Sequence, residues 1–166
     1  MQNEQPINPT PPAPTAASPK PAHGKRRHAR ELAVQFLYQF DLNTVAIDEA
    51  LTLFWQTQSD IGAPVRKFAE DLLRGCVTNR DIIDQNIKKY TEHWELSRIA
   101  AVDRNILRLA IYEMTCRNDI PPVVSINEAV EIAKRFSTRE SGAFVNGILD
   151  RLRSDLTRPA RTATGK

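Results

Sequence analysis

The chain has 166 residues and a net charge of +3, with 41% hydrophobic and 26% charged residues. These values are typical of one globular domain with tails. No apolar run approaches the roughly 20 residues needed to cross a bilayer, and the first residues lack the charged and apolar regions of a secretory signal. Composition therefore argues against a membrane-spanning or secreted protein, and we expect a cytoplasmic one.

The positive charge is concentrated at the two ends of the chain. Residues 5–30 hold five Lys or Arg side chains and no acid, and residues 151–166 hold five against one acid. The body between them therefore carries a net negative charge. Basic clusters of this kind often bind a polyanion. A purely solubilising role is the alternative that charge alone leaves open.

Composition divides the chain into three parts. Residues 1–24 hold seven of the eleven prolines, and such a segment is expected to be a disordered extension, because it cannot build a core. Residues 25–156 carry helical apolar patterns and are expected to form a single all-helical domain. Residues 157–166 are expected to be a flexible basic tail.

The first helix is predicted over residues 28–40. Phe36 and Leu37 belong to a stripe with helical spacing and are expected to face inward. Tyr38 points nearly opposite this stripe, on the same side as Arg27 if the helix begins that early. An outward tyrosine beside arginines can stack on a base while the guanidinium groups hold phosphate. An ordinary surface tyrosine is the alternative.

The next helices are expected to begin near Ile47, at Pro64, which suits a first turn, and after Thr78 as an N-cap. A bend over residues 91–101 follows. We expect Trp94, Leu96 and Ile99 in this bend to fill the space between two groups of helices.

A central helix is predicted over Val102–Arg117, where apolar residues cover far more than one stripe. A helix that is apolar nearly all round is buried. Its start carries Asp103, Arg104 and Arg108, and the two arginines would repel each other unless acidic partners were present. These charges indicate either a contact site or a helix end that projects into water.

Two further helices are predicted from capping patterns, Ser125-x-x-Glu128 and Ser137-x-x-Glu140. The Asp119-Ile-Pro-Pro segment ends the preceding helix, because a residue before proline disfavours the helical conformation.

Phe144 lies off the apolar stripe of the last predicted helix and close in angle to Arg151. A ring beside an arginine at the edge of a core can be a stacking platform for a base. Packing of the ring against the preceding helix is the alternative.

No segment alternates like a strand, so the predicted fold is all-α, with about seven helices in two small bundles that share a central buried helix. Cys76 and Cys116 lie in apolar helical patterns and are expected to be reduced, packed thiols. The histidines are scattered and no glycine-rich phosphate loop is present. We therefore expect no enzyme activity, no metal and no cofactor. The signal for a DNA-reading helix-turn-helix is weak.

Several blocks, in this order, resemble the NusB family of transcription antitermination factors. They cover most of the chain after Gly24 and comprise residues 26–35 (Arg-Arg-His-Ala-Arg-Glu-Leu-Ala-Val-Gln), Leu37-Tyr38, residues 102–108 (Val-Asp-Arg-Asn-Ile-Leu-Arg), residues 125–134 (Ser-Ile-Asn-Glu-Ala-Val-Glu-Ile-Ala-Lys) and residues 144–150 (Phe-Val-Asn-Gly-Ile-Leu-Asp).

The resemblance implies two three-helix bundles. It implies binding of single-stranded boxA RNA from ribosomal RNA operon leaders, together with the small-subunit ribosomal protein NusE. It also implies assembly with RNA polymerase and other Nus factors, and a possible homodimer in the free protein. An acidic body would suit a basic ribosomal protein as partner.

Combining the resemblance with the patterns above, the expected RNA-binding residues are Arg26, Arg27, Arg30, Tyr38, Phe144 and Arg151, and the expected partner-binding residues are Tyr38, Asp103 and Arg104. Two other readings stay open. A similar helical domain precedes the catalytic domain of a ribosomal RNA cytosine methyltransferase, but this chain would then need a separate catalytic partner. A purely structural dimer is the other.

Overall fold

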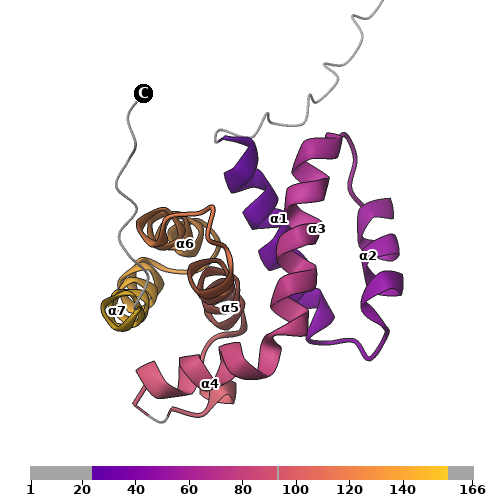
Figure 1. The fold of residues 1–166 in the computed structure, drawn as a ribbon. Coiled ribbons are helices and arrows are strands. Elements are labelled where there is room, and N and C mark those ends of the chain that lie inside the picture. Colours follow the sequence, from indigo (N-terminus) through magenta and orange to yellow (C-terminus); the bar gives the residue numbers. More distant parts are fainter. Residues whose placement is uncertain (1–23, 93, 157–166) are drawn as a thin grey trace, which may run out of the picture.

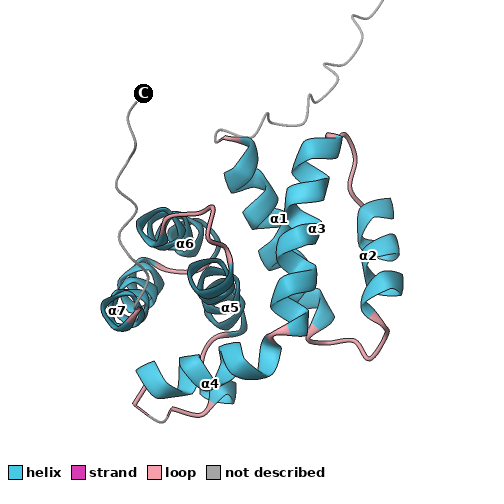
Figure 2. Cartoon of the chain, in the orientation of Figure 1, coloured by secondary structure: helices cyan, strands magenta, loops and turns pink. Residues whose placement is uncertain are grey.

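The structure is a computed structural model and describes residues 24–92 and 94–156. Over these residues it contains α-helices and one 3₁₀ turn but no strand (Figure 2). The elements are α1 (Lys25–Phe40), α2 (Ile47–Gln56), α3 (Ala63–Thr78), α4 (Arg80–Tyr90), the 3₁₀ turn η1 (Leu96–Arg98), α5 (Ala101–Cys116), α6 (Pro122–Phe136) and α7 (Arg139–Asp155). Apart from Gly24, the predicted extension and tail lie outside the described residues.

Helix α5 lies at the centre of the molecule. Figure 1 shows α1, α2 and α3 on one side of it, α6 and α7 on the other, and α4 across the lower end. Its buried apolar residues face several directions and comprise Ile106, Leu107, Leu109, Ala110, Ile111 and Met114, each at most 3% exposed. The predicted buried helix shared by two bundles is thereby confirmed.

The inward stripe of α1 is also confirmed. Phe36 is 2% exposed and meets Phe54 of α2 edge to face, with 5.4 Å between ring centroids. Burial of such a side chain stabilises the fold by about 1.5–3 kcal/mol. Tyr38, on the opposite side of the helix, is 42% exposed.

The predicted caps at Thr78 and Ser125 are wrong, and the one at Ser137 is displaced by one residue. Thr78 belongs to the last turn of α3, and Asn79 precedes α4. Helix α6 begins at Pro122, because a proline is already set for a first helical turn, so Ser125 lies inside the helix.

The cap of α7 is one residue later than predicted. The hydroxyl of Thr138 accepts a hydrogen bond of 3.1 Å from the backbone N–H of Ser141.

The expectation that both cysteines are packed thiols holds for only one of them. Cys76 is buried, and burial raises the pKa of its thiol to about 12, whereas Cys116 at the end of α5 is exposed.

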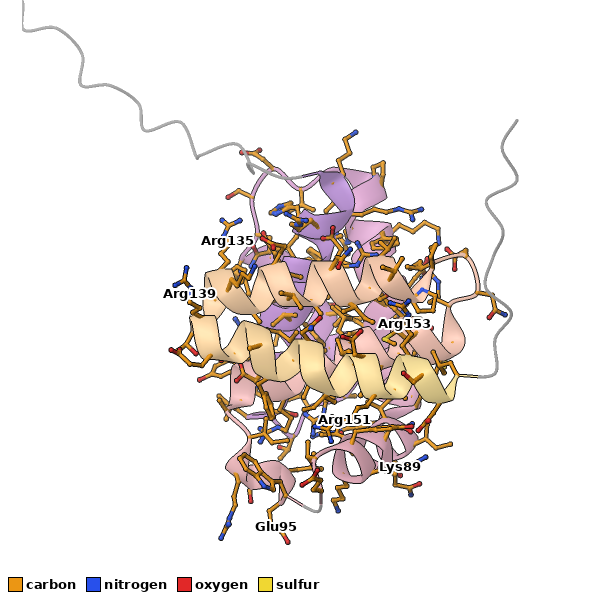
Figure 3. All side chains as sticks on the ribbon, turned by 90° about the vertical axis from the view of Figure 1, so that its left-hand side faces the viewer. Lys89, Glu95, Arg135, Arg139, Arg151 and Arg153 are labelled. Atoms are coloured by element: carbon orange, nitrogen blue, oxygen red, sulfur yellow. The ribbon has the colours of Figure 1, made fainter. Side chains whose placement is uncertain are left out.

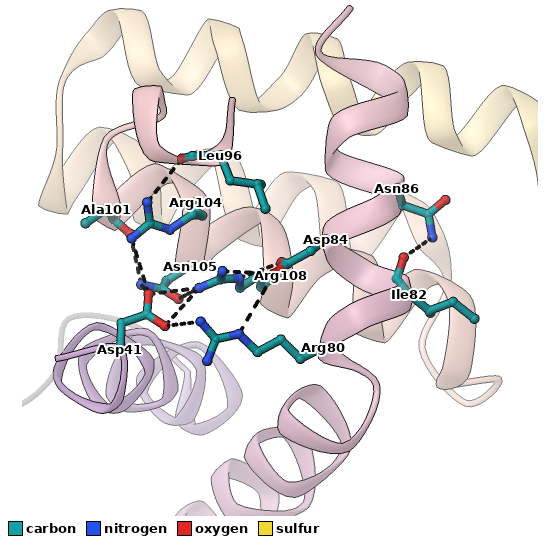
Figure 4. Close-up of polar contacts among 10 residues, drawn as sticks. All are labelled: Asp41, Arg80, Ile82, Asp84, Asn86, Leu96, Ala101, Arg104, Asn105 and Arg108. Atoms are coloured by element: carbon teal, nitrogen blue, oxygen red, sulfur yellow. Dashed lines mark hydrogen bonds and ion pairs between the residues drawn. The ribbon is translucent and has the colours of Figure 1, made fainter. Parts of the chain in front are cut away.

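The charges at the start of α5 have partners within the chain (Figure 4). Arg108 Nη1 donates a hydrogen bond of 2.8 Å to Asp41 Oδ2, and Arg108 Nε donates one of 2.8 Å to Asp84 Oδ1. The Asp41 carboxylate also accepts hydrogen bonds from Arg80, Arg104 and Asn105. This cluster therefore ties the end of α1 to α4 and α5, and the side chains of Arg104 and Arg108 do not project into water.

Candidate nucleic-acid interface

Three guanidinium groups surround one aromatic ring near the start of α1. The ring of Phe68 on α3 has the Arg26 guanidinium carbon 4.9 Å from its centroid, that of Arg30 at 5.3 Å and that of Arg117 at 5.6 Å. Each such cation–π contact contributes about 0.5–1 kcal/mol at an exposed site. Three positively charged side chains therefore lie around the Phe68 ring at this end of the molecule.

The three predicted arginines of α1 have different environments. Arg26 is exposed and is oriented by the Phe68 ring. Arg27 is partly buried and donates hydrogen bonds of 2.7 and 3.0 Å to the carboxylate of Glu128, which raises the pKa of Arg27. Arg26 therefore presents its guanidinium to a ligand more openly than Arg27 does.

Arg30 lies inside the protein. Its residue is 3% exposed, and Arg30 Nε donates a hydrogen bond of 2.7 Å to Glu113 Oε1 on α5. A guanidinium in this position holds α1 against α5 and is not presented at the surface. The Arg30 guanidinium is therefore not available to a ligand at the surface.

Arg117 was not among the expected site residues, although it shares the Phe68 ring with Arg26. It donates two hydrogen bonds of 2.9 Å to Asp119, and these bonds hold the pKa of that carboxyl at about 2. Its contact with the ring depends on how α3 and α5 pack, so local sequence patterns did not indicate it.

Tyr38 lies well away from Arg26 along the same helix. Twelve residues separate the two, which corresponds to roughly 18 Å of helical rise. Leu42, just after the helix, is 75% exposed. Helix α1 therefore offers two separate contact zones, a cationic one at its start and an aromatic and apolar one near its end.

The residues expected to bind a partner at the start of α5 serve internal contacts. Asp103 is 6% exposed and accepts a hydrogen bond of 2.9 Å from the Ser141 hydroxyl. Arg104 donates a hydrogen bond of 3.1 Å to the Leu96 carbonyl and has a side chain only 18% exposed. These contacts hold η1 and α7 against α5, so neither residue is retained in the proposed interface.

The expectation that Trp94 fills the space between bundles is wrong. Trp94 is 55% exposed, and its ring stacks on that of Phe144 with 6.3 Å between centroids and 29° between planes. The turn after α4 runs along α7, so the indole lies at the surface. Phe144 itself is partly buried, and therefore is neither an isolated surface ring nor a core residue.

Basic side chains continue along the outer face of α6 and α7, as Figure 3 shows. Arg139 and Arg153 are exposed, and neither forms an ion pair with another residue that the structure describes. Arg151 is 55% exposed and approaches Glu92 at 3.5 Å, while Arg135 pairs with Glu31 at 2.9 Å. This face lies between the start of α1 and α4 in Figures 1 and 3.

The described residues hold neither a metal-binding group nor a membrane-spanning helix. No group of three or more His, Cys, Asp or Glu side chains is placed to hold a metal ion. No described helix is long and apolar enough to span a membrane.

Comparison with known proteins identifies the family. Residues 27–154 match the NusB family. Over 131 residues the chain is 51% identical to the transcription antitermination protein NusB of Desulforapulum autotrophicum, which covers 78% of this chain and 92% of that protein.

Solved structures agree with this match. The fold is similar to that of T. maritima NusB, with a TM-score of 0.71, 38% identity and coverage of 80% of this chain and 93% of that one. It is also similar to a crystal structure of the antitermination factors NusB and NusE in complex with double-stranded RNA, with a TM-score of 0.72, 25% identity and coverage of 80% and 98%. The chain belongs to the NusB family.

Proposed function

We propose that this protein is a transcription antitermination factor that binds boxA RNA of ribosomal RNA operon leaders together with NusE. It catalyses no reaction and, as a partner of RNA polymerase and other Nus factors, acts in the cytoplasm. The observation that carries the proposal is the exposed guanidinium of Arg26, held on the Phe68 ring at the start of α1. The relatives named as antitermination proteins support it.

The binding mechanism combines charge and stacking. Arg26 and the exposed arginines of α7 neutralise phosphates, so affinity falls as salt rises. The aromatic surface at Phe144 stacks on a base, which contributes about 1–3 kcal/mol per base. Stacking on a side chain needs an unpaired base, so single-stranded boxA is the preferred ligand. The related complex with double-stranded RNA makes a duplex the informative control.

The partner contact is assigned to the other end of α1. Tyr38 is 42% exposed and lies about three helical turns from the Arg26 zone. NusE seated there leaves the start of α1 open to RNA. The negative charge of residues 31–150 favours a basic ribosomal protein.

The test is a titration of labelled boxA RNA with the purified protein, followed by fluorescence anisotropy with and without NusE. A scrambled strand and a boxA duplex are the controls. We expect tighter binding to single-stranded boxA than to either control, and a further gain when NusE is added. Equal affinity for boxA and the scrambled strand, in both the presence and absence of NusE, would contradict the proposal.

A further inference from the structure

Trp94 is an unusual residue for a surface. It is 55% exposed, whereas Trp55 is 7% exposed. Single exposed apolar side chains are ordinary on protein surfaces. Trp94 differs because its ring is stacked on a second aromatic ring, that of Phe144, on a helix that also carries Arg151.

The indole is held in place by the turn that carries it. Trp94 rests on Phe144, and Glu92 of the same turn lies 3.5 Å from Arg151. Phe144 and Arg151 are seven residues apart on α7, which places them two helical turns apart on the same side. The turn thus contacts one side of α7 at two points, and the stacking contact with Phe144 orients the indole before any ligand arrives.

We propose that Trp94 and Phe144 form a two-ring platform, with an unpaired RNA base stacked on the indole of Trp94 and Arg151 placed for the adjoining phosphate. This inference rests on the proposed function and assigns it a second stacking residue. The Arg151–Glu92 pair is solvent-exposed, and such pairs contribute little, so a phosphate can take the place of Glu92 as the partner of Arg151.

The charges around Trp94 favour a base over the backbone at this position. Glu92 and Glu95 lie two residues before and one residue after Trp94 in the sequence and are exposed, and their carboxylates repel phosphate. A strand that crosses here therefore turns a base toward Trp94 and keeps its phosphates toward the arginines of α7. A flat indole beside an arginine is the pairing that single-stranded nucleic acid uses.

The experiment uses the intrinsic fluorescence of Trp94. Trp55→Phe leaves Trp94 as the sole tryptophan, and Trp55 Nε1 forms no hydrogen bond with the described residues, so this change removes none there. Single-stranded boxA RNA is titrated into the full chain while indole emission and the anisotropy of labelled RNA are recorded. We expect the emission to be quenched over the same RNA concentrations at which anisotropy rises.

Affinity measurements complete the test. Trp94→Ala should weaken binding by about 5- to 150-fold, the equivalent of one lost stack, and Trp94→Phe should retain most of the affinity. The matched control is Leu53→Ala on α2, because Leu53 is 53% exposed and lies outside the platform. It should leave affinity unchanged. Circular dichroism establishes that each variant is folded, and the quenching result does not depend on Trp94→Ala.

Two outcomes would overturn the platform. RNA binding with unchanged emission, and with Trp94→Ala equal to wild type, would remove Trp94 from the site and leave the proposed function standing. Quenching by NusE alone, with none by RNA, would assign the indole to a protein contact. Failure of every variant and of the wild type to bind boxA would instead refute the proposed function together with the platform.

Discussion

Arg30 Nε lies 2.7 Å from Glu113 Oε1, and both side chains are almost fully excluded from solvent. Burial raises the pKa of Glu113 even though the Arg30 charge acts in the opposite direction. The pair joins α1 to α5 across 83 residues of sequence. It separates an arginine that holds the fold together from the neighbouring Arg26, which is available to a ligand.

The first prediction uses this difference. Arg30→Ala leaves the Glu113 carboxylate buried without its partner and should lower the free energy of unfolding by about 3–5 kcal/mol. Arg26→Ala removes an exposed cation and should change it by less than about 1 kcal/mol. Urea unfolding followed by circular dichroism measures both. Similar losses for the two variants would contradict the distinction.

The second prediction concerns the salt dependence of RNA binding. If Arg26 contacts one phosphate, Arg26→Ala should reduce the slope of log K against log salt by about 0.7 for a single strand. Binding is measured by anisotropy at several salt concentrations. Arg66→Ala is the control, since Arg66 is an exposed arginine of α3 paired with Glu70. An unaltered slope in the Arg26 variant would mean that this guanidinium touches no phosphate.

The third prediction concerns acid stability. Burial acts to raise the pKa of Asp41, but Arg108, the Asn105 hydrogen bond and further arginines outweigh it, so the pKa is lowered from its ordinary value of 3.8. Just below pH 3.8 the Asp41 carboxylate therefore binds a proton in the unfolded chain but stays ionised in the folded chain. The stabilisation that ionised Asp41 provides is present above pH 3.8 and is lost as the pH falls through the lower pKa of Asp41 in the folded protein.

Asp41→Asn tests this assignment. The amide cannot neutralise the arginines around it, so the variant should lose roughly 3 kcal/mol at neutral pH. The difference from wild type should then shrink as the pH falls below the ordinary value of 3.8. Urea unfolding of both proteins across the acid range gives this difference. A difference that stays constant with pH would show that Asp41 contributes no charge-dependent stability.

Local periodicity predicted the helices well because their apolar stripes repeat within a few residues. Phe36 and Leu37 face the core as expected, and α5 is buried as its composition indicates. The caps were less predictable, since several residues compete for each helix start. Pro122 begins α6 ahead of Ser125, and neither the spacing nor the residue types of the Ser125-x-x-Glu128 pattern show this.

The site depends on contacts that sequence patterns do not contain. Sequence resemblance indicated three arginines of α1 equally, but only packing decides that Arg30 meets Glu113 and that Arg26 stays exposed. Trp94 lies at the surface just after a turn in which Glu92 has a φ of 54°. This conformation is uncommon for a residue other than glycine, so the sequence carried no signal for it.

The last prediction concerns the close packing of α3 against α5. A Cβ atom added to Gly75 would overlap the ring of Tyr112. Gly75→Ala should therefore destabilise the fold by about 1–3 kcal/mol through overpacking, although alanine favours a helix by about 1 kcal/mol. The matched control is Gly147→Ala in α7, where the added atom meets nothing within 4 Å and should stabilise the fold by about 0.5–1 kcal/mol. Urea unfolding of both variants measures whether each change lowers or raises the free energy of unfolding. A gain in stability for Gly75→Ala would show that Tyr112 moves aside without loss and that the contact does not set the distance between the helices.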